Sequence, residues 1–248
     1  MKNKKILKSR YNNDGFAIIR KLISPNEIKS IKIDLSKHIE KQKKILKGRD
    51  INFTKDGSVN SIHMMDNWKW TKKIQNDPKL KNLAEFFLDE KPVNYGAELF
   101  AKPAKTGRYV PAHQDNYYWA IDDANALTFW IALDKTSKKN GGIYYYKKTN
   151  QLGLLEHAPS FAPGSSQTLK YPNSMKHFKK VIPSLMPGDC IVHNVLVVHG
   201  SEKNTSNEPR MGWTVRYKSI KSKKDKFQEK KYLEELEMQI KGRQNARI

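Results

Sequence analysis

Cysteine is almost absent from this chain of 248 residues, which contains only Cys190. A single thiol cannot form an intrachain disulfide. It lies in the apolar run Cys190-Ile191-Val192, where a cysteine usually acts as a small buried hydrophobic residue. No apolar run approaches the roughly 18 residues of a membrane span. The basic residues 1–8 are not followed by the apolar segment of a signal peptide. We therefore expect a soluble, cytoplasmic protein.

Acidic residues are also scarce: 25 Asp and Glu stand against 47 Lys and Arg, which gives a formal net charge of +22. Such a balance is typical of proteins that bind nucleic acid. The lysines, however, are spread along the chain, and the stretch 190–220 carries few of them, which favours a generally Lys-rich composition. Nucleic acid is therefore an alternative partner and not the expected one. The hydrophobic content of 38% is low but sufficient for one core.

The pattern of residues 11–92 is that of a mainly helical part. Residues 14–19 read as a turn that leads into a short strand. Ser24, Pro25 and Glu27 form the capping box and first-turn proline of a helix, and residues 41–60 are expected to be a loop. The apolar face of this helix consists of Ile28, Ile31, Leu35 and Ile39.

A second helix is expected between Asp77-Pro78, which supplies a cap and a first-turn proline, and Lys91-Pro92. Between the two helices, His63 precedes Trp68 and Trp70. We interpret this histidine as a partly buried polar residue in an aromatic cluster.

From residue 93 the periodicity changes to that of strands. The expected strands are 93–102, 110–119 if it is extended, 127–133, 143–146, 190–199 and 211–217. Residues 147–180 form a long irregular segment that could be a lid. Residues 220–248 have the composition of a charged helical tail. We expect one domain over 1–248, mainly β with flanking helices, in which 93–219 form a sandwich or jelly roll.

A candidate site begins in the stretch Val110–Trp119. If it is extended, His113 and Asp115 point to the same face, because side chains alternate along a strand. An imidazole nitrogen and a carboxylate oxygen can then converge on one cation. This is two thirds of the arrangement of two histidines and one carboxylate that holds Fe(II) and leaves positions open for substrates.

The third ligand must come from a later strand, where His193 and His199 compete. They are six residues apart, so alternation cannot choose between them. His199 comes just before Gly200-Ser201, at an expected sheet rim, and Arg210 opens the return strand. A guanidinium there could bind the carboxylate of a 2-oxo acid with two parallel hydrogen bonds.

Taken together, these residues resemble the phytanoyl-CoA dioxygenase family of Fe(II)- and 2-oxoglutarate-dependent oxygenases. The main matches are His113-Gln114-Asp115, His199-Gly200-Ser201 and Arg210, which follows His199 by eleven residues. The supporting matches are Asp14-Gly15-Phe16, Thr128-x-Trp130-Ile131-Ala132-Leu133-Asp134, Asn140-Gly141, Pro187-Gly188-Asp189 and Asn204-Thr205-Ser206. The resemblance covers roughly residues 11–219, and it is the order and spacing of the motifs that makes it specific.

The resemblance implies a double-stranded β-helix (a cupin-like jelly roll) with flanking helices. It implies His113, Asp115 and His199 as the ligands of Fe(II). For the cosubstrate 2-oxoglutarate, it implies Arg210 and Ser201 at the distal carboxylate. It also implies Trp130 as a neighbouring aromatic residue, with Asn94 and Lys102 as weaker candidates for contacts.

The chain departs from the family pattern after Asn140-Gly141, where many relatives have Pro-Gly-Ser-His and this chain has Lys147-Lys148-Thr149-Asn150. A coenzyme A thioester is therefore not implied as the substrate. Asp115 favours hydroxylation, because related halogenases lack this carboxylate. The resemblance thus implies O₂-dependent hydroxylation of a small molecule with release of succinate and CO₂.

Two features bear on the substrate. Tyr117, Tyr118 and Trp119 could line the pocket or pack in the core. Arg108, Lys105 and Lys147 flank the expected mouth, which favours an anionic small molecule. The alternatives are an oxygenase that acts on nucleic acid and an inactive binding module of the same fold.

Overall fold

The computed structural model describes residues 2–160, 162 and 165–245. Its main sheet has seven strands in the order β1, β11, β6, β13, β4, β3, β2, and a sheet of four strands has the order β10, β7, β12, β5. The strands of the main sheet are β1 (Phe16–Ile19), β11 (Cys190–Asn194), β6 (Ala126–Ala132), β13 (Arg210–Ser219), β4 (Pro92–Lys102), β3 (Val59–Ile62) and β2 (Ile51–Phe53). Those of the smaller sheet are β10 (Lys180–Val181), β7 (Ile143–Tyr146), β12 (His199–Ser201) and β5 (Val110–His113).

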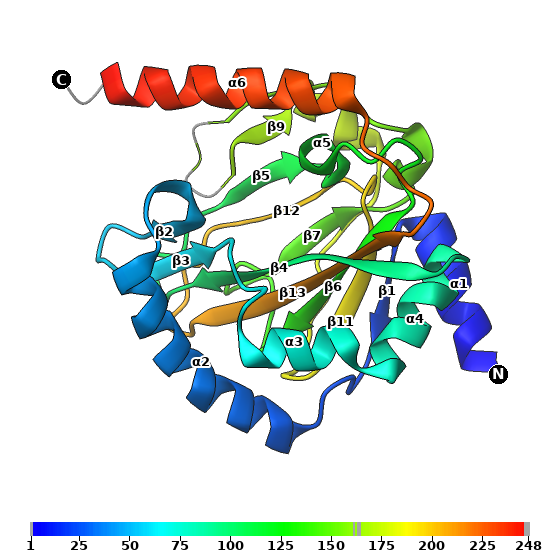
Figure 1. Cartoon of the computed structure of the whole chain (residues 1–248), viewed down its shortest axis with the longest axis horizontal. Helices are drawn as coiled ribbons and strands as arrows, with labels where there is room; N and C mark the ends of the chain where they lie inside the picture. The colour runs from blue at the N-terminus through cyan, green and yellow to red at the C-terminus, as the bar shows by residue number, and fades with distance from the viewer. Residues whose placement is uncertain (1, 161, 163–164, 246–248) are drawn as a thin grey trace.

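Neighbouring strands in both sheets pair antiparallel, and the two sheets form a jelly roll, as predicted. A separate hairpin consists of β8 (His157–Pro159) and β9 (Gln167–Leu169). The helices are α1 (Lys2–Asp14), α2 (Pro25–Ile45), α3 (Lys69–Asn76), α4 (Pro78–Leu88), α5 (Asn116–Trp119) and α6 (Lys226–Asn245). Short 3₁₀ helices are η1 (Gly48–Asp50), η2 (Thr149–Leu152) and η3 (Pro172–His177). Figure 1 shows α2, α3 and α4 along one side of the molecule and α6 across the other, past β5 and β9.

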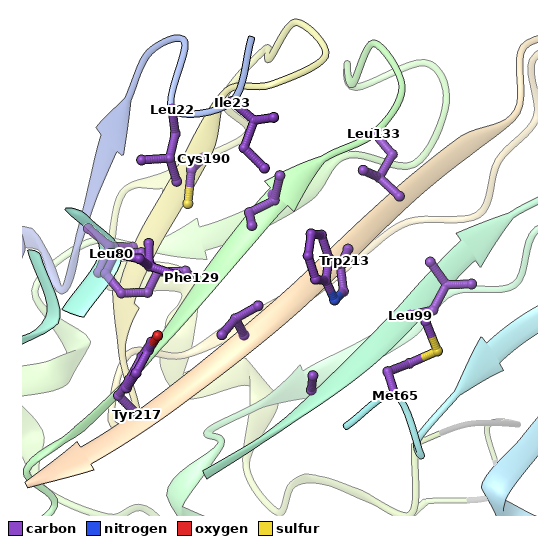
Figure 2. Packing of buried hydrophobic residues seen from close by; sticks show 14 of the residues in the cluster. Leu22, Ile23, Met65, Leu80, Leu99, Phe129, Leu133, Cys190, Trp213 and Tyr217 are labelled. Carbon is purple, nitrogen blue, oxygen red and sulfur yellow. The ribbon is translucent and has the colours of Figure 1, made fainter. Parts of the chain in front are cut away.

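The largest hydrophobic core lies between the main sheet and the helices. Every second residue of β13, Trp213, Val215 and Tyr217, is buried in it, because alternate side chains of a strand share one face. Phe129 and Ile131 of β6 add to the same layer. Figure 2 shows Trp213, Tyr217 and Phe129 on their strands, with Leu80 of α4 nearby. This face of the sheet is therefore occupied by packing.

The helix starts were predicted correctly. The Ser24 hydroxyl accepts a hydrogen bond from the Glu27 amide at 3.3 Å, and the capping box is complete. Asp77 caps α4 by accepting from the Lys79 amide at 2.7 Å. The helix ends at Leu88, however, and not at Lys91, because Asp89 adopts a left-handed conformation with φ 55°.

The N-terminal part is less purely helical than predicted. Residues 41–60 are not simply a loop: α2 continues to Ile45, and the hairpin of β2 and β3 extends the main sheet. These strands are short and carry polar residues, so no alternation of apolar residues marks them in the sequence. Helix α1 was not predicted either. The division of the chain into one domain with three parts stays a prediction.

Two further expectations were wrong. Residues 190–199 are not one strand: β11 ends at Asn194, the chain turns, and β12 begins at His199 in the other sheet. Residues 147–180 are not irregular throughout, since they contain η2, β8, β9, η3 and β10. That this segment opens as a lid stays a prediction. None of the helices in the described part of the chain is long and apolar enough to cross a membrane.

Candidate metal centre

The structure brings His113, Asp115 and His199 together, although not by the alternation that the sequence suggested. Strand β5 ends at His113, and Asp115 is already in a helical conformation (φ −58°, ψ −35°) before α5. The tight turn directs the carboxylate back toward the histidine. His199 lies directly opposite His113 in the pairing of β12 with β5. The prediction that residues 110–119 form one extended stretch is therefore wrong. His113 and Asp115 nevertheless share a site, because the turn brings their side chains together.

The three side chains are close enough to hold one ion. Asp115 Oδ1 lies 3.7 Å from His113 Nε2 and 3.6 Å from His199 Nε2. One ligand atom from each residue lies within 4.8 Å of the others. Two imidazole nitrogens and one carboxylate oxygen are a donor set that suits Fe(II).

Both histidines present an unprotonated nitrogen to this point. His113 Nδ1 donates to the carbonyl oxygen of Pro111 at 2.8 Å, and His199 Nδ1 donates to that of Val197 at 3.0 Å. A carbonyl can only accept, so the proton of each neutral ring is on Nδ1 and the lone pair is on Nε2. Burial lowers the pKa of each histidine to about 4, which keeps both rings neutral at neutral pH.

Asp115 uses its two oxygens differently. Oδ2 accepts from Thr128 Oγ1 at 3.0 Å and from His193 Nε2 at 3.1 Å, while Oδ1 faces His113 and His199. Burial alone would raise the pKa of this carboxyl, but His199 and His193 outweigh it and the pKa is lowered. The carboxylate is thus ionised, with one oxygen held by outer partners and one available to a metal.

The same contacts distinguish the two histidines that the sequence left in competition. His193 uses both ring nitrogens, since its Nδ1 bonds to the Tyr145 hydroxyl at 3.0 Å and its Nε2 bonds to Asp115. His199 keeps Nε2 directed at the site. His193 therefore orients the carboxylate, and His199 belongs to the ligand group.

A cavity of about 470 Å³ opens beside these ligands. Lys102, Trp130, Ser201 and Arg210 all line it. Asn94, in contrast, lies toward the other end of β4, is exposed and is not part of the lining, so its predicted role is not supported. Asn94 and Lys102 lie on the same strand, but only Lys102 reaches the cavity.

Arg210 and Lys102 form a cationic end of the cavity. They face each other in the pairing of β13 with β4, and both are buried. Arg210 donates to the Gly141 carbonyl, and its Nε has no hydrogen-bond partner among the described residues. Burial lowers the pKa of Arg210 to about 10, so the guanidinium stays charged at neutral pH. Lys102 donates to the carbonyls of Arg108 and Glu202, and burial beside Arg210 lowers the pKa of its ammonium group. No salt bridge joins either side chain to a carboxylate in the described ranges.

Gly212 explains how Trp130 fits beside Arg210. A Cβ on Gly212 would lie 1.7 Å from the ring of Trp130, so only glycine lets the indole lie across β13 at this point. The Arg210 guanidinium then sits 5.3 Å from the centre of the same ring. A buried guanidinium with an unpartnered Nε, a buried lysine and an aromatic wall fit a small dicarboxylate such as 2-oxoglutarate.

A second charged group lines the cavity and was missed from the sequence. Glu98 Oε1 lies 2.9 Å from His63 Nδ1 and 3.3 Å from Arg216 Nη2, and both Glu98 and Arg216 line the cavity. Burial alone would raise the pKa of Glu98, but Arg216 and His63 outweigh it and the pKa is lowered. Alternation along β13 was the available signal, since it places Arg216 on the same face as Arg210.

The aromatic run behind the ligands has two roles. Tyr118 and Trp119 line the cavity, whereas Tyr117 stacks on His157 and donates to Glu235 of α6. Helix α6 closes this side of the cavity with Tyr232, Leu236, Gln239 and Ile240. Of the three cations expected at the mouth, only Arg108 lines the cavity; Lys147 instead pairs with Asp14 at 2.7 Å. Two of the three cations that favoured an anionic substrate, Lys105 and Lys147, therefore lie outside the cavity lining.

The fold and these side chains define a class: jelly-roll proteins that can hold a divalent metal between two histidines and a carboxylate, next to a cationic pocket. The chain belongs to the phytanoyl-CoA dioxygenase family of Fe(II)- and 2-oxoglutarate-dependent oxygenases. The family model for phytanoyl-CoA dioxygenase matches residues 11–212.

Curated relatives agree with this membership. A phytanoyl-CoA dioxygenase domain-containing protein 1 homolog from Caenorhabditis elegans is 24% identical, over 93% of this chain and 96% of the relative. The peroxisomal phytanoyl-CoA dioxygenase of Bos taurus is 23% identical over 79% of this chain, and the match spans 63% of the bovine protein.

Solved structures share the fold. A crystal structure of EctD from S. alaskensis with 2-oxoglutarate and 5-hydroxyectoine is 18% identical, covers 86% of this chain and 75% of its own, and has a TM-score of 0.70. A crystal structure of the same protein with bound Fe has a TM-score of 0.71 at the same identity and coverage. SnoK, a non-heme alpha ketoglutarate dependent carbocyclase from nogalamycin biosynthesis, is 19% identical over 88% of this chain and 85% of its own, with a TM-score of 0.72.

Proposed function

We propose that this protein is an Fe(II)- and 2-oxoglutarate-dependent dioxygenase that hydroxylates a small molecule. The observation that carries the proposal is the convergence of His113, Asp115 and His199 in one cavity with Arg210 and Lys102. The metal ligands and the cationic end correspond to the two binding functions that such an enzyme needs. Family membership and the EctD structures with Fe and with 2-oxoglutarate support the same assignment.

Each group of residues has a defined task in this proposal. His113 Nε2, Asp115 Oδ1 and His199 Nε2 would hold the iron, while Thr128 and His193 keep the carboxylate in place. When bound, iron together with 2-oxoglutarate and O₂ supplies the oxidising power for hydroxylation of a C–H bond, with release of succinate and CO₂.

The cationic end positions the cosubstrate. Arg210 and Lys102 would bind the distal carboxylate of 2-oxoglutarate, with Ser201 as an additional hydroxyl and Trp130 as an apolar wall. A carboxylate there would give the buried Nε of Arg210 a partner and would favour the charged form of the adjacent Lys102, whose pKa is lowered by burial. Trp119, Tyr118 and helix α6 would limit the access of water to the reacting centre.

The direct test is release of succinate from 2-oxoglutarate in the presence of Fe(II) and O₂. We expect slow turnover by the unchanged protein even without a substrate, and none by His113→Ala. His177→Ala, which changes an exposed histidine, is the matched control and should retain turnover. If the unchanged protein binds no iron and releases no succinate, the chain is instead an inactive binding module of this fold.

An oxygenase that acts on nucleic acid is the second candidate, and the formal charge of +22 favours it. Such a protein would bind DNA or RNA tightly and in a strongly salt-dependent way. A mobility-shift assay at moderate salt should show no complex if the substrate is a small molecule. A cytoplasmic location stays a prediction.

A further inference from the structure

The pair Glu98–Arg216 is a buried ion pair in the described cavity lining, and neither the metal ligands nor the cosubstrate end accounts for it. The two side chains are only 17% and 15% exposed. A buried ion pair is seldom a net gain in stability, because each charge loses its hydration. We propose that this pair is the substrate head-group site and that it binds the ammonium and carboxylate of an amino acid. The inference rests on the proposed function, whose substrate class it names.

The pair stands next to the candidate metal ligands. Arg216 lies directly across from Thr128 in the pairing of β13 with β6, and Thr128 donates to Asp115. Glu98 lies across from Thr214 on the other side of β13. Arg210 is six residues from Arg216 on the same strand, which corresponds to about 20 Å of extended chain. The cosubstrate end and the pair are therefore well separated along the cavity.

The local backbone is shaped to hold Arg216 in place. The pairing of β13 with β4 shifts register between Val215 and Tyr217, and Gly96 of β4 has φ +109° there. A Cβ on Gly96 would lie 3.0 Å from Arg216 Nη2, so the guanidinium occupies the space that a side chain would take. It also stacks 5.2 Å from the ring centre of Trp119.

Both members of the pair keep bonding capacity for a ligand. The two side-chain contacts of Glu98 are made by Oε1, which leaves Oε2 available as far as the described residues are concerned. The Nε of Arg216 is buried and has no hydrogen-bond partner within the described part of the chain. A guanidinium binds a carboxylate, and a carboxylate binds an ammonium, through charge-assisted hydrogen bonds.

The contact between the two charges selects the class of ligand. A simple anion would be repelled by Glu98, and a simple cation by Arg216. In an α-amino acid, one carbon separates the ammonium from the carboxylate, so the two groups can meet Glu98 and Arg216 at once. The walls beyond the pair are mostly apolar and aromatic: they include Tyr118, Trp119, Tyr232, Leu236 and Ile240, with the polar Ser165, Ser166 and Gln239 among them. We therefore expect an apolar side chain on the amino acid.

The size of the cavity agrees with a small ligand. Its volume of about 470 Å³ lies toward the lower end of the range of ligand pockets and must also hold 2-oxoglutarate.

The test is calorimetric titration of the full chain, supplied with Mn(II), with the common protein amino acids one at a time. 2-Oxoglutarate is titrated separately and is also included in a second series. At least one apolar amino acid should bind. Its N-acetyl derivative, which lacks the ammonium, and its methyl ester, which lacks the carboxylate, should each bind about tenfold to a hundredfold more weakly.

The variants test the pair itself. Glu98→Gln with Arg216→Gln removes both charges together, which avoids leaving one buried charge without a partner. Amino-acid affinity should fall by about tenfold or more. The matched control is Glu90→Gln with Lys221→Gln, which removes a surface pair and should bind normally. If Glu98→Gln with Arg216→Gln does not fold, titration of the unchanged protein with the N-acetyl and methyl ester derivatives still tests the proposed subsite.

The outcomes separate the two proposals. If 2-oxoglutarate binds and no amino acid does, or if the derivatives bind as tightly as the free amino acid, the subsite is overturned and the proposed function stands. Binding of an amino acid without binding of 2-oxoglutarate would support the subsite and overturn the proposed function. Binding of neither overturns both.

Discussion

The two faces of the main sheet are built from the same strands, but one face packs against the helices and the other lines the cavity. Along β13, one face carries Trp213, Val215 and Tyr217, which are buried against the helices, as the packing in Figure 2 illustrates for Trp213 and Tyr217. The other face carries Arg210 and Arg216, which line the cavity. The first face stabilises the fold by removing apolar surface from water. The second keeps charges away from water, at a cost in stability that its ligands would offset.

Because the two faces are separate, we expect that the stability of the fold and the binding affinities of the cavity can be changed separately. A substitution on the helix side should lower the free energy of unfolding without changing the affinities of the folded protein. A substitution on the cavity side should change affinities more than unfolding.

The largest effect is expected for His199→Ala, which should abolish metal binding because it removes a ligand. His193→Ala should weaken metal affinity only about 10- to 100-fold, since it removes a group that orients Asp115. Titration of Mn(II), followed by electron paramagnetic resonance, measures both. Loss of binding in His193→Ala with retention in His199→Ala would reverse the two roles.

On the helix side, Trp213→Ala should lower the free energy of unfolding by about 3–5 kcal/mol, because it empties a fully buried site. Trp213 packs edge-on against Trp68 at 5.1 Å between ring centres. Urea denaturation measures the change. Trp213→Phe should lower the free energy of unfolding by less, because the phenyl ring fills part of the site. The separation of the faces would be refuted if the folded Trp213→Ala protein also bound Mn(II) much more weakly.

Arg210→Ala should raise the KM for 2-oxoglutarate about 10- to 100-fold, because a charged hydrogen-bond partner of a carboxylate is lost. Metal affinity should change little. Steady-state succinate release at varied 2-oxoglutarate measures the KM. Lys218→Ala, which removes a cation from the same strand that does not line the cavity, is the control. An unchanged KM in Arg210→Ala would remove this residue from its role.

The smallest effect is expected for Ser201→Ala. One neutral hydrogen bond to the cosubstrate is worth about 0.5–1.5 kcal/mol, so the KM for 2-oxoglutarate should rise about 2- to 10-fold. Strand β12 pairs through its backbone, and the fold should therefore be unaffected. The same kinetic assay measures the change, and equal values for the two proteins would leave Ser201 without a part in binding.

Much of the site could be predicted because its residues lie in short, ordered motifs. His113, Asp115, His199 and Arg210 were selected from spacing and resemblance, and the structure brings all four to one cavity. Asn94 could not be excluded from the sequence. It has the same parity as Lys102 on β4, and only the position of the cavity along the strand separates them.

Other features could not be predicted from the sequence, because segments that are far apart in the chain form them. His193 and His199 read as one strand in the sequence, but they lie in different sheets because the chain turns after Asn194. Likewise, the pairing of Glu98 with Arg216 joins residues from two separate strands. Neither alternation nor spacing encodes which strands become neighbours.

The sequence alone therefore determined the local structure: the caps at Ser24 and Asp77, the run of β-forming residues in β6, the alternation along β13, and the order of the site motifs. These follow from forces between residues that are close in the chain. Tertiary structure decided which oxygen of Asp115 faces the metal position, which histidine completes the ligand set, and what the cavity can bind. Those depend on contacts between segments that only the packed fold brings together.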